Sequence, residues 1–320
     1  MSTFTINTTE IGGRLDSPTS PKDAVKGSHG SPCNQVDLAA ELADRLKEDV
    51  RYNPDAHQWL TWNAGWQVDE TNCAMYEHIT QQLQGIVNRE QTGTPEQVRQ
   101  AKKWQIFVST HLSHRGLKDM AAMLQLQNRL VARGSSIDAN PDLLGTPSGV
   151  IELDTGNYRA ARREDLVTRR TTIDPAIAAD CPRWKQFLAE TISNDPEVLS
   201  YLQQVIGYCL TGHTSIEQMW ILVGSGSNGK STFLRTLQAV MGKYATTAAE
   251  TVLLRTGQGS GANNDVAALK GARLVTLAET DQNRALNEAK LKQLVSGDVV
   301  SARLLFSNFS DFRPTGKLFL

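Results

Sequence analysis

A short segment in the last third of the chain has the composition and spacing of a phosphate-binding loop. Residues 224–232 read GSGSNGKST, which fits the pattern G-x-x-x-x-G-K-[ST]. Glycines let a backbone curl until several N–H groups point at one anion, and the positive end of a following helix strengthens the attraction. Phosphate contacts are expected from the whole segment: Gly224, Ser225, Gly226, Ser227, Asn228, Gly229, Lys230, Ser231 and Thr232.

Two side chains of this segment have more specific expected roles. Lys230 can reach the β- and γ-phosphates and support catalysis, and the Ser231 hydroxyl can bind Mg²⁺. The apolar run 219–223 predicts a buried strand before the loop, and residues 233–241 predict an amphipathic helix after it. A glycine- and serine-rich turn could match the pattern by chance, but this context favours a nucleotide site with ATP and Mg²⁺ as cofactors.

A catalytic carboxylate is expected downstream, on a neighbouring strand. Residues 273–279 (RLVTLAE) predict a buried strand that ends in Glu279. A carboxylate there can hold Mg²⁺ through water and polarise the attacking water. Glu279 is the first candidate for both roles and Asp281 is the second candidate for catalysis, the alternative being a solvated acidic turn. The stretch between Lys230 and Glu279 has room for one helix, a short strand at 251–255 and a polar loop at 257–264.

The segments after this strand alternate in type. Residues 286–295 predict a helix, residues 299–306 a strand, and residues 307–313 a turn. Residues 317–320 (KLFL) begin another apolar strand. The predicted class is therefore α/β.

Four blocks in this order resemble a known family. The blocks GSGSNGKST, LKGARLVTLAETD, LKQLVSGDVVSARLLF and FRPTGKLFL resemble the phage and plasmid primase-helicases of helicase superfamily 3, which are relatives of the poxvirus primase-helicase. Upstream, residues 143–157 and 202–212 resemble the helical domain that precedes the ATPase in that family. The resemblance covers the chain from about residue 37 to its end.

The resemblance implies a P-loop NTPase core of the AAA+-like superfamily 3 type behind a mainly helical domain. It implies an ATP-driven helicase or translocase on single-stranded DNA, forming a hexameric ring when full length, with a separate primase as a further partner. The family's channel-lining hairpin corresponds to residues 299–313. There Arg303 would pair with phosphate and Phe306 would stack on a base; the alternatives are a solvated Arg303 and a core Phe306.

Three parts are expected along the chain. Residues 1–36, rich in Ser, Thr, Gly and Pro, predict a disordered tail or linker. Residues 37–214 predict the mainly helical domain with a β-hairpin near 150–158, and residues 215–320 the NTPase core. The family places an asparagine and an arginine finger beyond the strand that begins at Lys317. Since the chain ends at Leu320, the resemblance implies a core that is incomplete at its C-terminus and impaired in hydrolysis.

Composition sets limits on the class of protein. A net charge of −1 and a pI of about 6.6 argue against a protein that coats duplex DNA, but not against a few basic groups in a channel. The N-terminus has no apolar signal-peptide core, and no run approaches the ~18 apolar residues of a membrane span. These features predict an intracellular protein without a membrane partner, and the resemblance implies the bacterial or phage-infected host cytoplasm.

Two clusters of side chains have more than one interpretation. Two other classes of protein also share the phosphate-loop pattern. Trp59, Trp62 and Trp66 favour core packing over base stacking. Five arginines between 159 and 170 could touch nucleic acid or form a solvated face. A P-loop ATPase for protein remodelling or DNA packaging would lack the SGDVVSAR block, and a P-loop small-molecule kinase would need an arginine-rich lid, which is not evident between residues 241 and 269.

Overall fold

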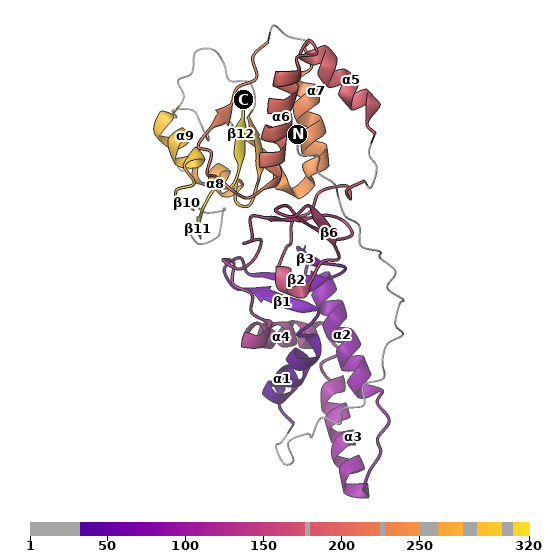
Figure 1. Cartoon of the computed structure of the whole chain (residues 1–320). Coiled ribbons are helices and arrows are strands. Elements are labelled where there is room, and N and C mark those ends of the chain that lie inside the picture. Colours follow the sequence, from indigo (N-terminus) through magenta and orange to yellow (C-terminus); the bar gives the residue numbers. More distant parts are fainter. Residues whose placement is uncertain are drawn as a thin grey trace. The chain divides into compact units, whose positions relative to one another are not determined.

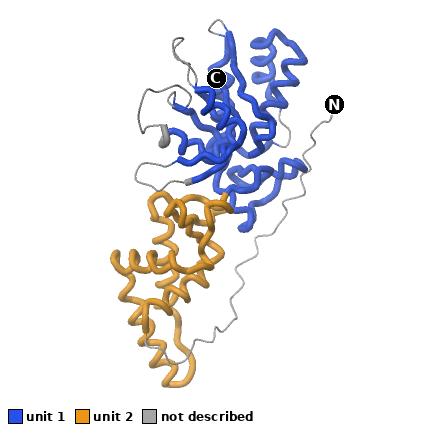
Figure 2. Tube along the Cα trace, turned by 90° about the vertical axis from the view of Figure 1, so that its left-hand side faces the viewer, with its two compact units in different colours: residues 1–8, 138–320 blue, residues 9–137 orange. Residues whose placement is uncertain are grey.

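The computed structural model describes residues 33–176, 180–224, 228–249, 252, 262–277, 287–302 and 310–320. These residues form two compact units, one ending at Ile137 and one beginning at Asp138 (Figure 2). The boundary therefore differs from the one expected at residue 214. The physical reason is that Leu144 and Val205, from the segment 138–214, share a hydrophobic core with Phe319 of the C-terminal sheet.

The first unit is built on four helices and a small sheet. Its elements are α1 (Gln35–Leu46), β1 (Val50–Asn53), β2 (Gln58–Trp62), β3 (Trp66–Asp69), α2 (Cys73–Val87), α3 (Pro95–Ser109), α4 (His114–Gln125) and the 3₁₀ helix η1 (Asn128–Leu130). Helix α3 begins as its sequence predicts: Thr94 caps it, Gln97 completes the capping box, and Pro95 occupies the first turn.

The tryptophan cluster of this unit belongs to an antiparallel sheet in the order β1–β2–β3. Trp59 and Trp66 are buried, and Trp62 meets Trp66 edge to face with ring centroids 5.3 Å apart. Trp59 packs in the core with residues of α1 and α2. The core interpretation is confirmed for these two residues, whereas the sheet itself was not predicted.

The second unit contains a four-stranded parallel sheet (Figure 1). Its strands are β7 (Met219–Trp220), β8 (Ala245–Ala248), β9 (Leu274–Leu277) and β12 (Lys317–Phe319), in the spatial order β7–β12–β9–β8. Strand β12 thus lies between β7 and β9, with Leu318 opposite both Met219 and Val275. The expected carboxylate strand is β9, which lies one strand further from β7 than predicted. Strand β8 lies before the segment 251–255, and apart from Val252 the short strand expected there lies outside the described residues.

Hydrophobic residues cover both faces of this sheet. The helices are α5 (Pro182–Thr191), α6 (Pro196–Leu210), α7 (Lys230–Met241), α8 (Ala262–Ala267) and α9 (Glu288–Val295), with the 3₁₀ helix η3 (Gly242–Tyr244) after α7. Because side chains alternate along a strand, Leu274 and Phe319 pack with α5, α6 and α7. Val275 and Leu318 pack in a separate cluster with α8 and α9. The predicted α/β class is confirmed.

Two smaller β structures complete the unit. Strands β4 (Leu143–Gly145), β5 (Val150–Glu152) and β6 (Asn157–Arg159) form an antiparallel sheet that contains the predicted hairpin, and the 3₁₀ helix η2 (Arg163–Asp165) follows. Strands β10 (Val300–Ala302) and β11 (Ser310–Phe312) pair antiparallel between α9 and β12.

Candidate functional site

The phosphate-loop segment leaves the carboxyl end of β7 and leads into α7. The backbone N–H of Leu222 donates to the carbonyl of Leu320, and the N–H of Leu320 donates to Trp220, so the pairing with β12 continues up to the loop. Gly224 and residues 228–232 are described, whereas Ser225, Gly226 and Ser227 lie outside the described residues. The predicted arrangement of strand, loop and helix is present at this position.

Lys230 bridges the two described ends of the loop. Its Nζ donates to the Gly224 carbonyl at 3.1 Å and to Asn228 Oδ1 at 2.9 Å. A Cβ atom at Gly224 would lie 1.5 Å from Asn228 Nδ2 and 3.1 Å from Lys230 Nζ. The Asn228 side chain therefore occupies the space beside Gly224, and a side chain at position 224 would have to displace it.

The first turn of α7 presents polar groups at the end of the loop. Gly229 caps the helix with φ +84°, in the left-handed region that glycine adopts without strain. The hydroxyls of Ser231 and Thr232 belong to exposed residues of the first turn. The N–H groups of a first helical turn lack intrahelical acceptors, which makes this end a place for an anion.

The other two predicted catalytic residues follow β9 in sequence. Glu279 and Asp281 lie outside the described residues, as does the loop around them. Strand β9 ends at Leu277, and because β7, β12 and β9 are parallel, their carboxyl ends lie at one edge of the sheet. Gln238 of α7 fixes that helix to the sheet: its Nε2 donates to Thr247 at 2.9 Å and to Thr276 at 2.6 Å. Gln238 belongs to none of the sequence motifs described above.

The predicted DNA-contacting residues belong to the β10–β11 hairpin. Ser301 lies opposite Asp311, and the buried residues Val300, Ala302 and Phe312 anchor the hairpin in the cluster shared with α8 and α9. Arg303 and Phe306 lie in the connection between the strands, outside the described residues.

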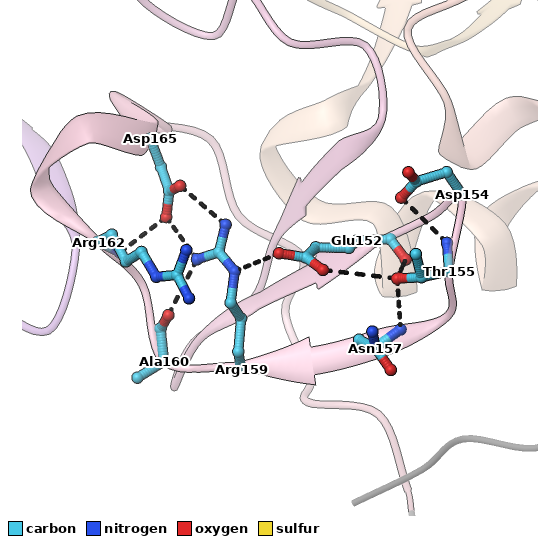
Figure 3. A network of polar contacts seen from close by, with 8 residues as sticks. All are labelled: Glu152, Asp154, Thr155, Asn157, Arg159, Ala160, Arg162 and Asp165. Atoms are coloured by element: carbon cyan, nitrogen blue, oxygen red, sulfur yellow. Dashed lines mark hydrogen bonds and ion pairs between the residues drawn. The ribbon is translucent and has the colours of Figure 1, made fainter. Parts of the chain in front are cut away.

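The arginines between 159 and 170 make internal contacts. Arg159 forms a two-pronged ion pair with Asp165 (2.8 and 2.9 Å) and also pairs with Glu152 (Figure 3). Burial alone would raise the pKa of Asp165, but the hydrogen bonds from Arg159 and from the Arg162 backbone outweigh it and hold that pKa below its usual value. Arg169 donates to the carbonyls of Lys243 and Lys270. The guanidinium groups of Arg159 and Arg169 therefore form contacts within the protein that stabilise the fold.

Two buried cations, Arg273 and Lys317, lie where β9 and β12 begin, at the edge of the sheet opposite the phosphate loop. No sequence motif predicts them. Arg273 donates to the carbonyls of Leu210 and Leu143, and Lys317 donates to Thr211 at 2.5 Å and Thr315 at 3.1 Å. Both therefore meet carbonyls at the C-terminal end of α6, where the helix dipole favours positive charge. Burial lowers the pKa of Lys317 to about 7.

Comparison with protein-family models matches two segments of the chain. Residues 39–193 match the family described as "D5 N terminal like". Residues 222–320 match a "Family of unknown function (DUF5906)", which spans the loop, α7 and the rest of the sheet. The first of these segments extends across both compact units.

Two curated viral proteins are similar in sequence. "Putative helicase L207/L206" of Acanthamoeba polyphaga mimivirus is 28% identical over 189 residues, covering 58% of this chain and 20% of the viral protein. "Putative helicase 121R" of Invertebrate iridescent virus 3 is 27% identical over 192 residues, covering 57% of this chain and 20% of its own length. The aligned part is thus about a fifth of each relative.

Among solved structures, the A-form apo structure of the NrS-1 C-terminal region aligns with a TM-score of 0.46 and 10% identity, covering 89% of this chain and 56% of that one. None of the helices in the described residues combines the length and the hydrophobicity of a membrane span.

Proposed function

Because the chain belongs to a primase-helicase-like family, we propose that its C-terminal part is the ATP-hydrolysing core of a superfamily 3 DNA helicase. The observation that carries the proposal is the position of the glycine loop. It connects β7 to α7 at the sheet edge where β9 also ends, one strand beyond β12. This arrangement supports a site in which a carboxylate following β9 would meet the phosphate loop at the same edge.

Each residue of the site has a proposed role. The loop N–H groups and the start of α7 would bind the phosphates of ATP, and Lys230 would exchange its loop partners for phosphate oxygens. Ser231 would ligate Mg²⁺, which when bound neutralises charge on the phosphates. Glu279 would polarise the attacking water, with Asp281 as the second candidate. The hydrogen bonds of Lys230 to Gly224 and Asn228 support a lysine ammonium that is positioned within the loop.

The proposed nucleic-acid partner is single-stranded DNA, contacted by the hairpin of β10 and β11. The two strands of the hairpin are anchored by Val300 and Phe312, which are buried in the cluster shared with α8 and α9. Arg303 would pair with a DNA phosphate and Phe306 would stack on a base. The proposed assembly is a ring of identical subunits, and a separate primase is a further proposed partner.

Stimulation of phosphate release by DNA tests the function. ATP turnover is measured alone, with single-stranded DNA and with a panel of small phosphate acceptors. The helicase proposal predicts several-fold stimulation by DNA and none by the acceptors. Turnover that responds to a small acceptor instead would indicate a kinase and contradict the proposal.

The hairpin role has its own test. For Arg303→Ala, loss of one phosphate contact is expected to reduce the salt dependence of DNA affinity by about 0.7 in log–log slope. Arg99→Ala is the control, because it removes the same charge from an exposed ion pair on α3. Equal slopes for the parent protein and Arg303→Ala would exclude the arginine from the DNA contact.

A further inference from the structure

The helix α5 packs directly on the phosphate loop. A Cβ atom at Gly229 would lie 3.0 Å from Phe187 Cε2, 3.0 Å from Thr191 Oγ1 and 3.2 Å from Phe187 Cζ. These distances are at or inside van der Waals contact, so the glycine backbone lies against these two side chains. Helix α5 thus passes beside the start of α7 (Figure 1).

The contacting face of α5 is held by aromatic packing. Trp184 stacks on Phe187 with ring centroids 5.3 Å apart and an interplanar angle of 27°. Trp184 also stacks on Phe233 of α7, at 5.9 Å and 10°. Since residues three or four apart share one helical face, Trp184, Phe187 and Thr191 form a continuous strip from the first turn of α7 to the loop.

The helix is fixed on its other contacts as well. Leu188 is buried in the core with Phe233 and Leu237 of α7. The Thr191 hydroxyl donates to the Phe187 carbonyl at 2.7 Å, which holds its oxygen near Gly229. The surface that meets the loop is therefore rigid, whereas the loop itself is rich in glycine, the residue with the greatest backbone freedom.

We propose that Phe187 is a positioning residue for nucleotide binding: its ring, with Thr191 beside it, holds Gly229 in the left-handed conformation that shapes the loop for phosphate. Phe187 acts on the loop backbone and not on the nucleotide. A binding site that is held in shape before its ligand arrives loses less conformational entropy when the ligand binds. The inference rests on the proposed ATP site at residues 224–232.

Phe187→Ala and Leu188→Ala form a matched pair for the test. Both truncate adjacent apolar side chains of α5 in one core, but only Phe187 is among the nearest atoms to Gly229. Affinity for a fluorescent ATP analogue with Mg²⁺ is measured where circular dichroism shows each variant folded, and the free energy of unfolding is measured by urea. Phe187→Ala is expected to weaken nucleotide binding about tenfold, whereas Leu188→Ala loses stability but keeps affinity within about twofold.

Phe187→Leu keeps part of the apolar contact and is expected to weaken nucleotide binding by about threefold, less than Phe187→Ala does, so it serves as the test if Phe187→Ala does not fold. Parent-like affinity of both Phe187 variants, or equal weakening in Phe187→Ala and Leu188→Ala, overturns the positioning role while leaving the nucleotide site intact. No nucleotide binding by the parent protein itself would instead overturn the proposed function.

Discussion

The ammonium group of Lys317 lies 4.6 Å from the centre of the Tyr208 ring, so a buried cation joins strand β12 to the last turn of α6. Cation–π contact and the carbonyl acceptors of Thr211 and Thr315 partly replace water around it. These contacts do not fully offset the free-energy cost of removing the charged ammonium group from water. The pKa of Lys317 therefore falls to about 7.

This shift predicts a stability that rises with pH. The folded-state pKa lies below the unfolded value of about 10.4, so between these values the unfolded chain binds the proton more tightly. The free energy of unfolding should therefore increase above pH ~7, by up to about 1.4 kcal/mol per pH unit, and the cost of burying the charge is fully present below that pH.

Urea unfolding of the parent protein and of Lys317→Met, between about pH 7 and 8.5, checks this prediction. The free energy of unfolding of Lys317→Met should rise less steeply with pH than that of the parent protein, because the variant has no ammonium group at this position. The range stops there because burial raises the pKa of Cys209 to about 12, and that thiol destabilises the fold as pH rises past its unfolded value of about 8.5. Parallel curves for the two proteins would contradict the assignment.

The ion pair of Arg159 and Asp165 also predicts a stability that rises with pH, but in the acid range. The folded-state pKa of Asp165 is lowered, so its contribution is present above the unfolded value of about 3.9 and is lost as pH falls through the folded value. Asp165→Asn should cost about 1–3 kcal/mol at pH 7, because it removes the two-pronged carboxylate from a part-buried guanidinium and leaves Glu152 paired with it. The difference from the parent protein should shrink in acid; a difference that is constant with pH would refute this account.

Gly229→Ala is expected to impair both the fold and nucleotide binding. Its φ of +84° costs a side-chain-bearing residue about 1–2 kcal/mol, and the added Cβ would press on Phe187. Gly207→Ala is the matched control. That residue lies within α6 with no atom within 4 Å of the added Cβ, so the change should stabilise the protein by about 0.5–1 kcal/mol and leave nucleotide affinity unaltered. Similar behaviour of the two variants would show that the loop does not require this conformation.

Glu279→Gln should separate binding from hydrolysis. The amide keeps the size of the side chain but cannot accept a proton, so turnover should fall by about 100-fold or more while the Kd for ATP stays within about twofold. Asp281→Asn is the comparison, measured in the same DNA-stimulated phosphate-release assay. If Asp281→Asn loses turnover and Glu279→Gln does not, the two carboxylates exchange roles.

Local signals were sufficient for much of the fold. Thr94 and Pro95 predict the start of α3 because capping depends on a few adjacent residues. The loop at 224–232 predicts the junction of β7 and α7, since its glycines and lysine are needed close together in sequence. The hairpin of β5 and β6 follows from the glycine turn at Gly156, which has φ +74°.

Long-range relationships were not predictable from such signals. No local feature shows that β12, last in sequence, enters the sheet between β7 and β9. The burial of Lys317 depends on carbonyls of a distant helix end. The sheet of the first unit has a weak local signal, because β2 buries three consecutive residues and lacks the alternation that marks a strand. The contact of Phe187 with Gly229 joins segments some forty residues apart, although the spacing of Trp184, Phe187 and Thr191 does predict one helical face.

The most direct test of the central claim is the affinity of Lys230→Ala for ATP and Mg²⁺. Nζ of Lys230 lies within the loop, bonded to Gly224 and Asn228, and the account requires it to neutralise phosphate charge. Titration with a fluorescent ATP analogue should show binding by the parent protein and by Lys243→Ala, an exposed lysine just beyond the far end of α7. Lys230→Ala should bind at least about tenfold more weakly, or about 1.4 kcal/mol. Equal affinity of Lys230→Ala and the parent protein would contradict a nucleotide site at this loop.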